Sequence, residues 1–213
     1  MIQGRHLLAA LTNCQFKMSE GFILPQDREY SFSTDTRTLR RDEVFLAISG
    51  ERFDGHDYIR EALKIGAILI IGENQRLRNL AANEEERKKI VGVENSLAAL
   101  AEIAKAHRRQ CRTKILAITG SAGKTTTKEL IKNCLSTTFA CNASAKSFNN
   151  QIGVPLTLLQ MEERHDFGIV ELGINHVGEM ENLTEWVSPD MSLITNIGMS
   201  HLAGLINIES VAN

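Results

Sequence analysis

Residues 119–126, Thr-Gly-Ser-Ala-Gly-Lys-Thr-Thr, combine the residue types that bind a phosphate group. Their small side chains allow a tight turn whose backbone N–H groups point at one spot, beside the positive end of a following helix. Lys124 adds a positive charge for the β- and γ-phosphates, and Thr125 offers a hydroxyl to Mg²⁺. The glycines stand closer together than in the usual phosphate loop. An ordinary strand–turn–helix connection with a surface lysine is therefore the alternative.

Glu171 and His201 are further candidates for the same site, because each lies at the end of an apolar run. Ligands of open α/β sheets bind at the carboxyl ends of strands. A carboxylate inside an apolar run needs a positive partner, so we expect Glu171 to hold Mg²⁺, the alternative being a salt bridge to a helix lysine. His201 is the weaker candidate, since Mg²⁺ prefers oxygen ligands. The amides of Asn149 and Asn150 suit a phosphate or substrate as well as a turn.

Alternating strands and helices must position these residues. Residues 115–119 form an apolar, β-branched run that predicts a buried parallel strand, and a helix is expected from Lys124 to about residue 135. The same reading predicts further strands over residues 43–48, 67–71, 90–93, 167–173 and 191–197. It predicts further helices over residues 5–13, 58–65, 95–109, 153–159 and 177–187.

Two further segments are predicted to lie at the protein surface. The charge-dense residues 73–89 predict a solvated helix or a surface excursion, and residues 142–151 predict a polar loop. The whole pattern is typical of the α/β class with parallel sheets. We expect an N-terminal α/β domain over residues 1–112 and a phosphate-loop-type, parallel-sheet ATP-binding domain over residues 113–213.

Composition excludes several classes of protein. The chain of 213 residues is 43% hydrophobic and carries a net charge of −2, and no aromatic residue interleaves its basic stretch at 105–112, so we expect no nucleic-acid partner. No apolar run reaches membrane-spanning length and residues 1–6 lack a signal peptide's core, so we expect no membrane insertion. The scattered cysteines argue against a zinc site, fit a reducing cytoplasm and read as small buried hydrophobes: Cys14, Cys111, Cys134 and Cys141.

Several motifs, in this order along the chain, resemble the Mur ligase family. In the second half these are residues 119–126, Phe-Asn-Asn-Gln-Ile-Gly-Val-Pro-Leu-Thr-Leu-Leu at 148–159, Glu-Leu-Gly at 171–173 and Thr-Asn-Ile-Gly-Met-Ser-His at 195–201. In the first half, Asp-Thr-Arg at 35–37 is followed by Gly-Glu-Arg-Phe-Asp-Gly-His at 50–56. The resemblance covers nearly the whole chain.

The resemblance implies a cytoplasmic, ATP-dependent amide ligase of peptidoglycan precursor synthesis. Its reaction would join D-alanyl-D-alanine to a UDP-N-acetylmuramoyl-tripeptide through an acyl phosphate, with ATP and Mg²⁺ as cofactors. The N-terminal domain would hold the UDP end of the substrate, and the complete enzyme is expected to be a monomer. The alternatives are a sibling ligase that adds another amino acid, a folate-type polyglutamate ligase, and a nucleotide-binding module without ligase activity. The first-half motifs speak against the folate relative.

The resemblance also implies roles for individual residues. ATP would lie against Thr119, Gly120, Ser121, Ala122, Gly123, Lys124, Thr125 and Thr126. The catalytic residues would be Lys124, Glu171 and His201, and Mg²⁺ would be held by Thr125, Glu171 and His201. The uridine side of the substrate would meet Asp35, Thr36 and Arg37, and the γ-phosphate and substrate would lie near Asn149 and Asn150.

The family has a C-terminal domain and a carbamoylated lysine that bridges its Mg²⁺ ions. By resemblance, both would lie beyond Asn213. We therefore expect this chain to be an inactive fragment of a longer ligase, with an incomplete ATP-binding domain.

Overall fold

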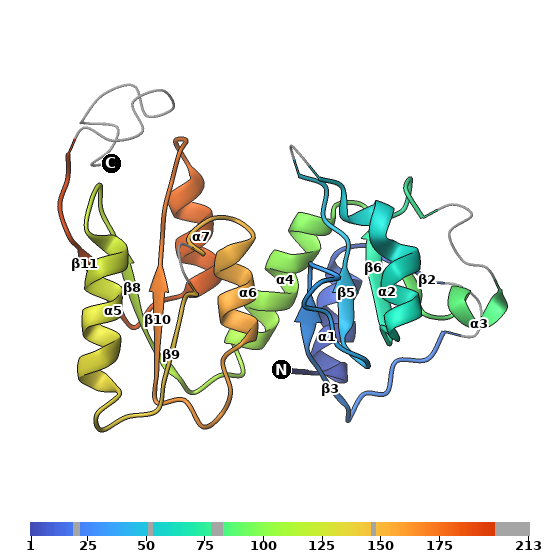
Figure 1. Cartoon of the computed structure of the whole chain (residues 1–213), viewed down its shortest axis with the longest axis horizontal. Coiled ribbons are helices and arrows are strands. Elements are labelled where there is room, and N and C mark those ends of the chain that lie inside the picture. The colour runs from blue at the N-terminus through green and yellow to red at the C-terminus, as the bar shows by residue number, and fades with distance from the viewer. Residues whose placement is uncertain (19–21, 51–52, 78–82, 146–147, 199–213) are drawn as a thin grey trace. The chain divides into compact units, whose positions relative to one another are not determined.

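The computed structural model describes residues 1–18, 22–50, 53–77, 83–145 and 148–198. The chain divides into two compact units, a first unit of Met1–His107 and a second unit of Arg108–Asn213. Strands and helices alternate in both units, which confirms the predicted α/β class (Figure 1).

The first unit is built on a five-stranded sheet. The strand order is β2 (Lys17–Met18), β7 (Ile90–Val93), β6 (Leu69–Glu73), β5 (Val44–Leu46) and β4 (Phe32–Ser33). Strands β7, β6, β5 and β4 run parallel, whereas β2 pairs antiparallel with β7. A separate antiparallel pair joins β1 (Ile2–Gln3) to β3 (Glu29–Tyr30). The helices are α1 (Gly4–Asn13), the 3₁₀ helix η1 (Gly55–Tyr58), α2 (Ile59–Ile65), α3 (Glu84–Arg87) and α4 (Ser96–Arg108).

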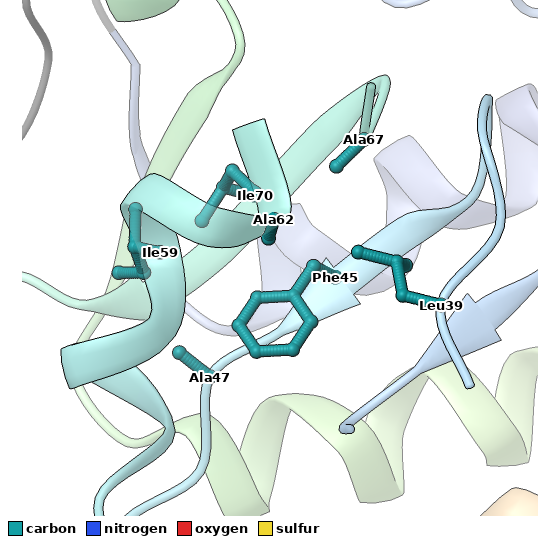
Figure 2. Close-up of a cluster of buried hydrophobic side chains, with 7 residues drawn as sticks. All are labelled: Leu39, Phe45, Ala47, Ile59, Ala62, Ala67 and Ile70. Carbon is teal, nitrogen blue, oxygen red and sulfur yellow. The ribbon is translucent and has the colours of Figure 1, made fainter. Parts of the chain in front are cut away.

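A hydrophobic cluster joins α2 to this sheet. Figure 2 shows the Phe45 ring in the middle of the cluster, with Ile59 and Ala62 of α2 and Ile70 of β6 around it. The helix ends where predicted, because Gly66 adopts a left-handed conformation with φ of 102° and its N–H donates to the carbonyls of the last turn.

The second unit is built on a four-stranded sheet that is parallel throughout. The order is β11 (Met191–Ile194), β8 (Lys114–Thr119), β10 (Phe167–Glu171) and β9 (Cys141–Ala143). The helices are α5 (Lys124–Leu135), α6 (Gly153–Leu159) and α7 (Glu179–Val187) (Figure 1). Since β8 and β10 are neighbours in register, the ends of both strands lie at one edge of the sheet, where α5 begins.

The structure corrects several sequence-based boundaries. Residues 141–143, which overlap the predicted polar loop, form β9. Strand β11 ends at Ile194. Beyond Glu73, which ends β6, the described residues of the charge-dense segment form only the single helical turn α3. The expectation of buried cysteines is wrong for Cys134, which is exposed, and the other three are only half-buried. Among the described residues, no helix has the length and apolar character needed to cross a membrane.

Candidate functional site

The turn between β8 and α5 depends on a glycine at position 120. Gly120 has φ of 132°, a region that side chains disfavour, and an added Cβ would collide with Thr195 Oγ1 and lie 2.9 Å from the Asn196 carbonyl oxygen. Gly123, with φ of 82°, precedes the first residue of α5. The predicted strand–turn–helix context of the loop is therefore present.

The segment that follows β11 holds this loop in place. Thr195 Oγ1 donates to the Ala122 carbonyl at 2.6 Å. The Ser121 and Ala122 N–H groups donate to Asn196, to its backbone oxygen and its Oδ1 respectively, both at 3.0 Å. The expectation that all the loop N–H groups point at one ligand position is therefore wrong for these two. They brace the loop instead.

The start of α5 is the part of the loop that could accept an anion. The N-cap residue Gly123 has no side chain that could cap the helix. The first N–H groups of a helix have no partner within the helix, so they are available to an anion. Lys124 curls back over the loop, where its Nζ donates to the Gly120 carbonyl at 2.5 Å. The ammonium group therefore lies beside this helix start.

Both carboxylate oxygens of Glu171 are held by neighbours. Glu171 ends β10 and is only 1% exposed. Its Oε2 accepts a hydrogen bond from Thr125 Oγ1 at 2.8 Å, and its Oε1 accepts one from Asn149 Nδ2 at 2.9 Å. The second unit thus brings together three sequence-predicted residues, from α5, from β10 and from the segment before α6.

Lys128, which sequence reasoning missed, is the positive neighbour of Glu171. Its side chain is fully buried, and its Nζ lies 3.8 Å from Glu171 Oε2. The same Nζ donates to the Ser144 carbonyl at 2.7 Å. The alternative of a salt bridge between Glu171 and a helix lysine is therefore confirmed. Lys128 follows Lys124 by one helical turn, and this spacing was the signal that could have found it.

The two asparagines differ in what they contact. The Asn149 backbone oxygen accepts from the Gly173 N–H at 2.8 Å, so both its main chain and its side chain are tied to the end of β10. Asn150 Oδ1 accepts from the backbone N–H groups of Ile152 and Gly153 at the start of α6. The Asn150 side chain therefore stabilises a turn, which is one of the two roles that the sequence left open for it.

The first-unit candidates form a local turn. Arg37 pairs with Asp35 through several hydrogen bonds, which, as the largest cause, hold the pKa of the Asp35 carboxyl below its usual range. The Arg37 side chain is 86% exposed, whereas Thr36 is buried. His201 lies outside the described residues.

The second-unit site offers oxygen ligands of the kind that Mg²⁺ takes. Thr125 Oγ1 and Glu171 Oε2 are close enough to share one ion, and the carboxylate is buried. Within the described part of the chain, no three His, Cys, Asp or Glu side chains are placed so that they could hold a metal ion together. A site with one carboxylate and one hydroxyl fits Mg²⁺, which usually keeps several waters and binds substrate phosphates.

Comparisons with known proteins match both halves of the chain. A family model described as "Mur ligase middle domain" matches residues 118–213, and one described as "Mur ligase family, catalytic domain" matches residues 30–108. Two curated relatives are both named UDP-N-acetylmuramoyl-tripeptide–D-alanyl-D-alanine ligase. The one from Bacillus subtilis is 36% identical over 86% of this chain, and the one from Synechocystis is 40% identical over 83%. The chain spans only 39% and 37% of their respective lengths.

Solved structures give the same likeness. Acinetobacter baumannii MurF has a TM-score of 0.81 at 30% identity, covering 99% of this chain and 44% of that one. Thermotoga maritima MurF, solved in complex with ADP, has a TM-score of 0.74 at 31% identity, covering 86% of this chain and 41% of that one.

Proposed function

The chain belongs to the Mur ligase family, and from this premise we propose that it forms part of an ATP-dependent ligase. The proposed reaction joins D-alanyl-D-alanine to a UDP-N-acetylmuramoyl-tripeptide in the cytoplasm. The names of the relatives from Bacillus subtilis and Synechocystis support this choice within the family.

One observation supports the nucleotide site most directly. The Thr125 hydroxyl contacts the buried Glu171 carboxylate at 2.8 Å, immediately beside the glycine turn and the start of α5. A helix N-terminus with a lysine favours the phosphates of ATP, and the oxygen pair favours their metal ion. The ADP complex of the Thermotoga maritima relative is consistent with this assignment.

In the proposed mechanism, a carboxylate of the tripeptide attacks the γ-phosphorus of ATP and ADP leaves. The amine of D-alanyl-D-alanine then attacks the resulting acyl phosphate, which releases inorganic phosphate and forms the amide. Such transfers depend on positioning and charge neutralisation rather than on a protein nucleophile. Lys124 would turn from the Gly120 carbonyl to the β- and γ-phosphates. Thr125 and Glu171 would hold Mg²⁺, which supplies charge neutralisation when bound.

The remaining roles belong to the same proposal. Residues 1–112 would form the domain that holds the UDP end, with Asp35, Thr36 and Arg37 on the uridine side. Residues 113–213 would form the ATP-binding domain, in which Asn149 and Asn150 lie near the transferred phosphate and His201 helps hold a second Mg²⁺. The complete enzyme would act as a monomer.

The test is a phosphate-release assay with ATP, UDP-N-acetylmuramoyl-tripeptide and D-alanyl-D-alanine. It is run on the complete ligase, in which this sequence is joined to the further region that its longer relatives carry. We expect phosphate release that requires both the tripeptide and the dipeptide. Release that requires a single amino acid in place of D-alanyl-D-alanine would identify a sibling ligase instead. ATP binding without release under any substrate combination would identify a binding module.

A further inference from the structure

Helix α5 buries a full positive charge beside the Glu171 carboxylate. Lys128 is the one described residue of α5 that is fully buried, although α5 also carries several apolar side chains. Lys128 and Glu171 are 0% and 1% exposed. Charges this deeply buried need partners, because leaving water is expensive for each ion.

Lys128 cannot easily leave this position. Its Nζ is tied to the Ser144 carbonyl at 2.7 Å, and Ser144 Oγ accepts the backbone N–H of Glu171 at 3.1 Å. Ser144 therefore contacts both members of the pair. Glu129 also lies 3.3 Å from Lys128 Nζ, but its side chain is half exposed, so water screens its charge.

The Lys128 ammonium and a metal ion would serve the same carboxylate oxygen. Oε2 of Glu171 is the atom that contacts Thr125 Oγ1, and it is also the atom 3.8 Å from Lys128 Nζ. A divalent cation placed against Thr125 and Glu171 would therefore lie near a fixed positive charge. Like charges in a buried site repel strongly, because the surroundings screen them poorly.

We propose that Lys128 is the internal counter-ion of Glu171 and that it sets the affinity of this carboxylate for a divalent cation by competing with it. With no metal bound, Lys128 balances the buried charge and keeps the carboxylate beside Thr125. With a metal bound, its repulsion weakens the complex, which allows the ion to be exchanged with each nucleotide. The inference rests on the proposed function only in the metal role of Glu171.

The test compares the full chain with Lys128→Met, using Mg²⁺ alone and no nucleotide, so it is independent of ligase activity. In metal-free buffer we expect the variant to lose about 10 °C in Tm, because one partner of a buried pair is gone. Adding millimolar Mg²⁺ should raise the Tm of Lys128→Met more than that of the parent, since the ion now supplies the missing charge. A Mg²⁺-induced rise no larger than in the parent would overturn the proposal.

Two controls separate charge balance from packing. Lys132→Met, the same change one turn further along α5, should leave the Mg²⁺ response at the parent value; a response as large as that of Lys128→Met would overturn the proposal. The double variant Lys128→Met/Glu171→Gln buries neither charge. Its Tm in metal-free buffer should be higher than that of Lys128→Met, and the larger Mg²⁺-induced rise in Tm should disappear.

The double variant also keeps the proposal testable if Lys128→Met fails to fold without metal. In that case Mg²⁺ should restore folding of Lys128→Met, and the double variant should fold without it. A double variant as unstable as Lys128→Met would show that Lys128 acts through packing alone, which would contradict the inference.

Discussion

The two units treat their charged candidate residues in opposite ways. In the second unit, Glu171 and Lys128 are almost completely buried and receive partners from several elements. In the first unit, Asp35 and Arg37 pair within one turn, and Arg37 is 86% exposed. Burying a charge is unfavourable without a specific environment, so the arrangement in the second unit indicates a built site. The exposed pair in the first unit joins sequence neighbours, so by itself it indicates only a local turn.

Burial alone does not mark a site, as His56 of the first unit illustrates. Its ring is buried, its Nε2 accepts the Glu73 N–H at 2.9 Å, and its Nδ1 lies 2.6 Å from Asp54. Asp54 in turn pairs with Arg76 at 2.9 Å. This network ties the η1 turn to β6 and satisfies its own polar groups. At Glu171, by contrast, the network adjoins an uncapped helix start.

The largest expected loss of stability comes from changing Gly120, in the turn between β8 and α5 of the second unit. Gly120→Ala should lower the free energy of unfolding by about 3 kcal/mol, because φ of 132° is strained for alanine and the new Cβ meets Thr195 and Asn196. Chemical denaturation measures this. Gly198→Ala is the matched control, since its Cβ would meet Ser121 only at 3.7 Å. Equal losses in the two variants would contradict the special status of Gly120.

A smaller loss of stability is expected for Asp190, a carboxylate of the second unit that, unlike Glu171, has a purely structural role. Asp190 accepts the Ile115 N–H at 2.8 Å and pairs with Lys114 and Arg108, each at 3.1 Å. The Ile115 hydrogen bond is the largest cause that lowers the pKa of the Asp190 carboxyl. Asp190→Asn should lower the free energy of unfolding by about 1 kcal/mol at pH 7.

The sign of the pH dependence follows from that lowered pKa. The stabilisation is present above the unfolded-state pKa of Asp190 and is lost as the pH falls through the lower folded-state pKa. Thermal unfolding of the parent and of Asp190→Asn, measured from pH 7 to pH 3, should therefore show the difference between their Tm values shrinking as the pH falls. A gap that widens on acidification would contradict the assigned role of the carboxylate.

The smallest structural effect is expected in the first unit. Arg37→Ala should leave the Tm unchanged, because the side chain is exposed and solvent screens its pair with Asp35. If Arg37 serves the substrate, the same variant should bind UDP-N-acetylmuramoyl-tripeptide several-fold more weakly, as fluorescence or calorimetric titration would measure. A clear fall in Tm with unchanged substrate binding would contradict this prediction and show that the Asp35–Arg37 pair stabilises the fold instead of binding substrate.

Local patterns account for what the sequence predicted correctly. The strand 115–119, the glycine turn and the helix from Lys124 occur together because each depends on residues next to one another in the chain. The stop of α2 at Gly66 depends likewise on a single residue's conformational freedom. Such features require no knowledge of distant contacts.

The features that were missed depend on tertiary contacts. Strand β9, Cys-Asn-Ala, is only three residues long, and its pairing with β10 gives it a strand conformation that its sequence does not favour. The bracing of Ser121 and Ala122 by Asn196 joins segments more than seventy residues apart. Lys128 reads as an exposed helix lysine until Ser144 and Glu171 are placed beside it.

The most direct test of the central claim, that the second unit binds ATP at the start of α5, is a calorimetric ATP titration in the presence of Mg²⁺. It compares the parent protein with Lys124→Ala and with the matched control Lys132→Ala on the same helix. We expect Lys124→Ala to weaken ATP binding by about tenfold or more, since a charge-assisted contact to phosphate is lost, while its Tm stays close to the parent value. Lys132→Ala should bind like the parent. Equal ATP affinity in all three proteins would contradict the assignment of this loop as the nucleotide site.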